Sequence, residues 1–148
     1  MKRRLFAVML VSSLGLLAAG RSSARDTKNM WPISGAMGTT DAKAKLDKGI
    51  KYYFGDSTHP EVARNFGVYM SNKKTNGANK EDKEACEWAF LSAMISFQER
   101  AVALGGDAVV NIRSYYRKNE ISSPTQYECG SGALMSGVTF QGEVVKLK

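Results

Sequence analysis

The side chains best suited to chemistry in this chain lie around its one histidine. His59 stands in a turn-rich stretch that also holds Asp56, Ser57 and Glu61. An imidazole between two carboxylates offers ligands for a metal ion and groups for acid–base hydrolysis. A zinc site needs further ligands, however, and Ser57 has neither an orienting acid nor an oxyanion motif beside it. We therefore expect no enzyme activity; the alternative is a small-ligand or metal-binding protein, or a weak hydrolase, with a site at Asp56, His59 and Glu61.

The first 24 residues have the three-part layout of a secretory signal peptide. A basic head precedes an apolar run over residues 5–19, and Ser22 and Ala24 place small residues at the −3 and −1 positions of a cleavage site. The apolar run is shorter than the roughly 20 residues of a membrane span. We therefore expect a mature chain that begins at Arg25 and is periplasmic or secreted.

The charge of the mature chain argues against nucleic acid as a partner. The whole chain has a formal net charge of +7, but four basic residues leave with the predicted signal peptide, and the mature charge is then about +3. So small an excess is ordinary for an exported protein and gives no basic footprint for nucleic acid. Arg21 stands where a lipoprotein cleavage site needs a cysteine, so we expect no lipid anchor.

The two cysteines, Cys86 and Cys129, both belong to the predicted mature chain. An even pair in an oxidising compartment favours one intramolecular disulfide. Two buried free thiols, or an intermolecular or reactive role, are the alternatives. A bridge between these positions would stabilise the fold by about 4 kcal/mol in the chain-entropy model.

Residues 79–106 predict the longest helix. Asn79 is a suitable N-cap, acidic residues fill the first turn, and Gly105 with Gly106 ends the helix. One apolar stripe consists of Cys86, Phe90, Ala93, Phe97, Ala101 and Leu104. A second stripe consists of Trp88, Leu91, Ile95 and Val102. A helix that is apolar on two sides needs two covers, and we expect one to be a sheet and the other the N-terminal arm or a second subunit.

The remaining pattern predicts strands on both sides of this helix. Residues 25–48 read as an N-terminal arm and a short helix, and residues 49–148 as a single α+β domain. Strands are expected over 49–55, 107–116, 126–129 and 133–147, with a surface loop over 71–79. The glycines at 130–132 indicate a bulge, or a place where a ligand approaches the backbone. The prediction is one long helix packed on a mainly antiparallel sheet.

Aromatic and basic residues occur together at the end of one predicted strand, over residues 113–118. This mixture suits an anionic glycan, a lipid headgroup or a protein partner; the alternative is an ordinary strand end with packed tyrosines and solvated arginines. The predicted interaction surface consists of Trp88, Leu91, Ile95, Arg113, Tyr115 and Arg117.

Several segments resemble known bacterial families. The stretch ERAVALGGDAVVNI at 99–112 resembles the core of the small YbjQ-like and RcsF-like proteins, and ECGSGALM at 128–135 resembles their glycine-containing return strand. KTNG at 74–77 and EAC at 84–86 resemble exported proteobacterial proteins often labelled "excinuclease ATPase subunit". The chain has no phosphate-binding loop and no Cys-x-x-Cys pair, so we expect neither an ATPase nor a nuclease.

The RcsF-like resemblance implies an envelope sensor or interaction module. RcsF-like proteins are lipid-anchored and carry two disulfides, whereas this chain has Arg21 at the anchor position and two cysteines in all. The YbjQ-like resemblance implies ring-shaped oligomers that would use the second helix stripe. We therefore expect a non-catalytic exported module, without a cofactor, that binds an envelope or extracellular protein or associates with itself; a purely structural oligomer is a further alternative.

Overall fold

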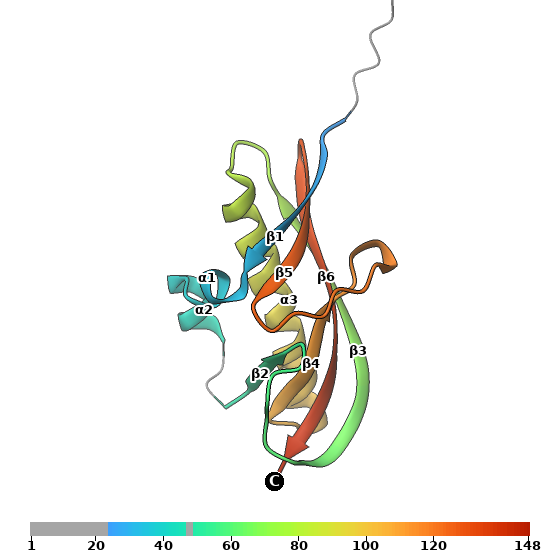
Figure 1. Cartoon of the computed structure of the whole chain (residues 1–148). Coiled ribbons are helices and arrows are strands. Elements are labelled where there is room, and N and C mark those ends of the chain that lie inside the picture. The colour runs from blue at the N-terminus through green and yellow to red at the C-terminus, as the bar shows by residue number, and fades with distance from the viewer. Residues whose placement is uncertain (1–23, 47–48) are drawn as a thin grey trace, which may run out of the picture.

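The sheet of this protein is organised around one long strand. The computed structural model describes residues 24–46 and 49–148, so the predicted signal peptide lies outside the described residues except for Ala24 (Figure 1). The strands are β1 (Asp26–Pro32), β2 (Lys51–Phe54), β3 (Val62–Asn76), β4 (Ala108–Ser114), β5 (Gln126–Gly132) and β6 (Met135–Leu147). One edge of β6 pairs with β3 along its length, and the other pairs first with β5 and then with β4. The sheet continues outward to β1 beyond β5 and to β2 beyond β4, and β2–β4 is its one parallel pair.

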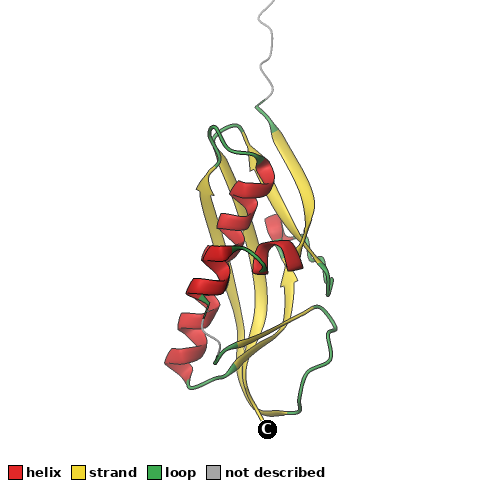
Figure 2. Ribbon diagram, turned by 90° about the vertical axis from the view of Figure 1, so that its left-hand side faces the viewer, coloured by secondary structure: helices red, strands yellow, loops and turns green. Residues whose placement is uncertain are grey.

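The helices lie on one face of this sheet (Figure 2). They are α1 (Ile33–Met37), α2 (Thr40–Lys45) and α3 (Asp82–Leu104), and a short 3-10 turn, η1, covers Tyr116–Lys118. The predicted α+β class, with one long helix on a mainly antiparallel sheet, is confirmed. Gly105 ends α3 as predicted, in a left-handed conformation whose amide donates to the carbonyl of Val102.

The core forms between α3 and the sheet. Phe90 is fully buried at its centre, with ring centroids 4.7 Å from Tyr127, 5.6 Å from Phe140 and 5.9 Å from Phe54. The predicted core stripe of α3 is buried from Cys86 to Ala101. Burial raises the pKa of the Tyr127 hydroxyl, with the charge of Glu87 as a second cause, so this side chain stays neutral.

Part of the second apolar stripe of α3 has a cover from the same chain, whereas Val102 at its far end is 59% exposed. Ile33 and Ala36 of α1 are buried in the core that α3 shares with the sheet. The ammonium group of Lys45, at the end of α2, lies 5.1 Å from the centre of the Trp88 ring. The short helices therefore pack against this side of α3. They belong to the N-terminal arm, which was one of the two candidates for the second cover.

Two local predictions are wrong. The helix begins at Asp82 with Glu81 as N-cap, because Asn79 has φ = 60° and belongs to a turn closed by the Lys80 amide on the Gly77 carbonyl. The predicted loop over 71–79 is strand as far as Asn76. Its polar side chains suit an edge strand whose hydrogen bonds come from β6.

Candidate binding surfaces

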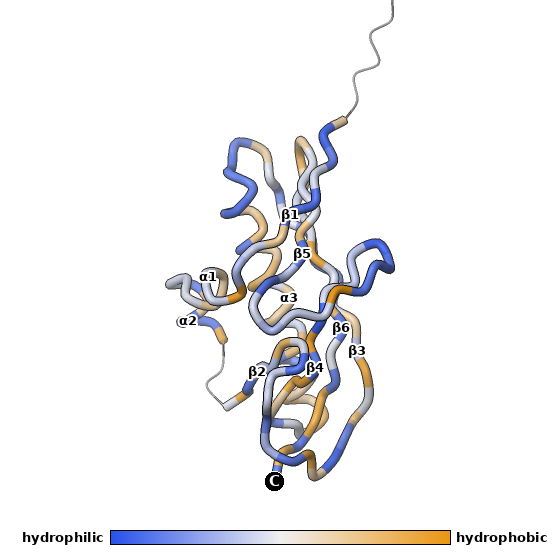
Figure 3. The backbone as a smooth tube through the Cα atoms, in the orientation of Figure 1, coloured by the Kyte–Doolittle hydropathy of each residue, from blue (hydrophilic) through white to orange (hydrophobic). Residues whose placement is uncertain are grey.

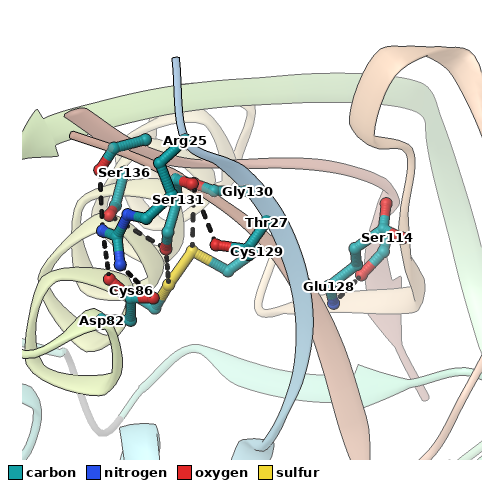
Figure 4. The surroundings of a disulfide bond; sticks show 11 residues. Arg25, Thr27, Asp82, Cys86, Ser114, Glu128, Cys129, Gly130, Ser131 and Ser136 are labelled. Atoms are coloured by element: carbon teal, nitrogen blue, oxygen red, sulfur yellow. Dashed lines mark hydrogen bonds and ion pairs between the residues drawn. A yellow bond between two sulfur atoms is a disulfide. The ribbon is translucent and has the colours of Figure 1, made fainter. Parts of the chain in front are cut away.

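The disulfide between Cys86 and Cys129 joins α3, one turn after its start, to β5 (Figure 4). Both residues are fully buried, and their Cα atoms are 6.0 Å apart. The Cys86 sulfur lies 3.4 Å from the hydroxyl of Ser131, which also accepts a hydrogen bond from Ser136. The predicted intramolecular bridge is confirmed, and it fixes the start of the helix to the sheet.

The residues around His59 do not converge on one point. The Ser57 hydroxyl donates to the Phe54 carbonyl at 2.6 Å, and the His59 ring lies beside Pro60 O and the Tyr53 ring. The carboxylate of Glu61 accepts from Lys148 instead of facing the histidine. Among the described residues, no three His, Cys, Asp or Glu side chains form a group that could hold a metal ion.

The six residues of the predicted interaction surface lie in different places. Leu91 is buried and, with Trp88, lines a hollow of about 90 Å³ beside Thr39 and Asp41; Ile95 is partly buried on the same helix. Arg113 of β4 and Met70 of β3 both pair with Gln141 of β6, so their side chains share one face of the sheet. The next residue on β3, Ser71, points to the other face, where its hydroxyl donates to the α3 backbone. Arg113 therefore lies on the sheet face opposite α3.

Arg113 and its neighbours are held by contacts within the chain. The Arg113 guanidinium lies 3.2 Å from the Glu120 carboxylate and donates to Gln141 at 3.1 Å. Tyr115 donates its backbone amide to the Thr139 carbonyl. The structure therefore does not bring the three helix residues and the strand-end residues into one continuous surface.

Glycines of β5 and β6 form the floor of a cleft of about 460 Å³ on the face away from α3. Tyr116 lies directly on Gly130, since a Cβ atom at that glycine would be 2.2 Å from the tyrosine hydroxyl. Gly130 pairs with Gly137, beside which the stem of Lys74 lies. The predicted bulge at 130–132 is therefore wrong, because β5 runs through these residues and the chain's own Tyr116 uses the close approach.

An ion pair closes one side of this cleft. The two terminal guanidinium nitrogens of Arg117 donate to the Asp26 carboxylate, at 2.7 and 3.2 Å. This hydrogen bonding raises the pKa of Arg117 above its usual value, and the guanidinium also stacks on Tyr116 at 5.3 Å. The preceding residue, Arg25, forms the same kind of bidentate hydrogen bond with the Asp82 carboxylate on α3 (Figure 4). The start of β1 is thus clamped to η1 on one side and to α3 on the other.

The outer edge of β3 has no partner strand within the described part of the chain. Two irregularities interrupt its first residues, and Gly67 at the second has φ = 110°. From Val68 to Asn76 the register with β6 is continuous. Val68 and Met70 are both 55% exposed on this segment, and Figure 3 colours part of the tube along β3 as hydrophobic. We name residues 68–76 the β3 edge.

A groove of about 230 Å³ lies between α3 and the first residues of the β3 edge. Phe97, Ala103 and Arg100 line it from the helix, and Tyr69 lines it from the strand. The Tyr69 hydroxyl donates to the Phe66 carbonyl at 3.1 Å, and the Arg100 guanidinium lies 4.9 Å from the Tyr69 ring centre. No local sequence pattern predicted this groove, although the exposed Val68 and Met70 alternate with the inward Tyr69 and Ser71 in the pattern of a strand.

Basic residues surround the β3 edge. Arg64 stacks on Phe66 at 4.9 Å, and Lys73 and Lys74 follow on the strand. With Arg100 on the helix these make four cations, none of which forms an ion pair with any residue that the structure describes. The groove lining contains one acidic residue, Glu99. The edge therefore carries a local positive charge.

Comparison with known proteins gives no relative of this chain. No family model matches it, and neither a curated protein nor a solved structure does so. In the ranges 24–46 and 49–148, no helix has both the length and the apolar character needed to cross a membrane.

Proposed function

We propose that the mature chain is a non-catalytic, exported interaction module of the bacterial envelope or its surroundings, and that it binds a protein partner at the β3 edge. The observation that carries this proposal is the edge itself. A regular strand whose outer edge has no partner, next to a groove, offers a binding protein both backbone hydrogen bonds and a pocket for side chains. Of the predicted interaction residues on α3, Leu91 is buried and Trp88 and Ile95 are partly buried, so we place the binding site at the β3 edge instead.

Export is supported by two separate features. The first is the predicted signal peptide, with cleavage after Ala24. The second is the buried disulfide, because such bonds persist in oxidising compartments and are rare in the cytoplasm. The resemblance of residues 99–112 to RcsF-like proteins favours the same class of role.

Site-specific photocrosslinking in the native cell tests the proposal. A photoreactive amino acid is placed at Val68 in one variant and at Val102, an equally apolar and 59% exposed position on α3, in a control variant. We expect a discrete adduct with an envelope or extracellular protein from position 68 and not from position 102. Adducts of equal yield from both positions, or none from 68, contradict the proposal. An adduct between two copies of this chain would favour the structural-oligomer alternative.

A further inference from the structure

We infer that the partner binds the β3 edge as an added β-strand and that the binding segment is acidic. This inference rests on the proposed function and specifies the chemistry of the partner at the same site. It joins three properties of the edge: its free backbone groups, the groove beside it and its unpaired cations.

The backbone of the edge sets the mode of binding. Because one edge of β3 is paired with β6, alternate residues direct their amide and carbonyl groups toward β6 and the others direct theirs outward. Over residues 68–76 this leaves about four or five residues able to bond a new strand. At about 3.3 Å per residue, the segment accepts an extended peptide of roughly 30 Å.

The groove gives the added strand a second contact. Alternate side chains of a strand point to opposite faces, so every second residue of the added segment would point toward α3. Ala103 and the Tyr69 ring, with Arg100 stacked on it, border the groove at that place, and Phe97 closes its floor with only 1% of its surface exposed. A bare sheet edge would offer only backbone contacts, whereas this groove also gives room to a side chain that faces the helix.

The charges decide between an acidic partner and a second copy of this chain. Lysines on an edge strand are a common protection against pairing of like strands, because two copies would bring the same charges together. Lys73 and Lys74 are such residues, and Arg64 and Arg100 add to them. The same charges attract a segment rich in aspartate and glutamate, which raises the rate of association as well as specificity.

Two labelled nine-residue peptides test the inference with the purified mature chain. In the first, glutamate alternates with valine and leucine, and in the second every glutamate is replaced by lysine. Fluorescence anisotropy should give at least tenfold tighter binding of the acidic peptide, with a preference that falls as salt rises. Methylation of alternate backbone amides in the acidic peptide should abolish binding if the peptide adds as a strand.

Charge reversal on the protein supplies the control. The double variant Lys73→Glu/Lys74→Glu should reverse the preference between the two peptides. Lys28→Glu/Lys118→Glu makes the same change in net charge at exposed positions away from the edge and should leave the preference in place. Failure of the acidic peptide to bind, equal binding of both peptides, unchanged binding of the methylated peptide, or equal effects of the two double variants would overturn the inference.

The two proposals fail in different ways. If position 68 crosslinks to a partner in the cell while the peptides show no acidic preference, the binding site stands and the inference about its ligand is wrong. If position 68 gives no adduct and the acidic peptide does not bind, both are wrong. Dimers of the mature chain linked through position 68 would replace the acidic partner with a second copy.

Discussion

Replacing both Cys86 and Cys129 with alanine removes a cross-link between residues that are 43 positions apart. In the chain-entropy model, a loop of this length gives the disulfide a stabilising contribution of about 4 kcal/mol at 25 °C. For a domain of this size, each kcal/mol corresponds to roughly 3–5 °C in melting temperature, so the double variant should melt about 12–20 °C lower. The cost arises mainly from the greater freedom of the unfolded chain.

Urea unfolding of the mature chain, followed through the fluorescence of Trp31 and Trp88, measures this loss. Wild-type protein that is first reduced in denaturant and then refolded in dithiothreitol should lose the same free energy as the double variant, since both then lack the cross-link. A loss below about 1 kcal/mol in both experiments would refute the chain-entropy argument. Equal losses of unfolding free energy in the two experiments would show that the missing disulfide, and not the substitution by alanine, causes the loss.

The same experiment separates a structural disulfide from a redox switch. Both cysteines are completely buried, so a reductant reaches the sulfurs only when the protein opens. We expect the native protein to keep its disulfide in dithiothreitol for as long as it stays folded. Rapid reduction in the absence of urea would show that the start of α3 opens readily and would favour a switching role.

Three further substitutions test the packing and the electrostatics. Phe90→Ala removes a fully buried ring and should lower the free energy of unfolding by about 3–5 kcal/mol in urea titrations, and a loss below 1 kcal/mol would contradict its central place. Gly130→Ala forces the Tyr116 ring away and should cost about 1–3 kcal/mol, most of which the added change Tyr116→Ala should restore. Hydrogen bonds from Lys146 and the Leu147 amide lower the pKa of Asp107, so its carboxylate stabilises the fold above its unfolded pKa near 4 and loses this effect as the pH falls through the lower folded value. The stability difference between wild type and Asp107→Asn should therefore shrink between about pH 5 and pH 2, and a constant difference would contradict it.

Much of the fold follows from local sequence signals. The apolar spacing from Cys86 to Ala101 gave the buried face of α3, and Gly105 gave its end, because both depend on interactions within one helix. The pairing of Cys86 with Cys129 followed from there being only two cysteines. The position of Asn79 misled the prediction, since an asparagine suits both an N-cap and the left-handed turn that it occupies here.

The candidate site could not be predicted in the same way. Residues 71–76 read as a loop because Ser, Asn, Lys and Thr dominate them, yet an edge strand with one open face needs few apolar residues. The groove exists because α3 crosses beside β3, and no local pattern specifies that approach. Tyr116 on Gly130 depends equally on tertiary structure, since these residues lie on different elements that meet only in the folded chain.

The pairing of β1 with β5 also has a consequence for the order of folding. Asp26 at the start of β1 lies opposite Gly132 at the end of β5. A strand that is synthesised early therefore cannot form its pairing until a strand near the C-terminus has been made. Contacts between such distant residues slow folding, because a long loop must close before they form. Cys86 likewise stays a free thiol until Cys129 has been made. The pairing of β1 and the disulfide of α3 therefore both form late in synthesis or after it. A nascent chain that ends before β5 contains β1 and α3 but lacks the strand that pairs with one and is cross-linked to the other.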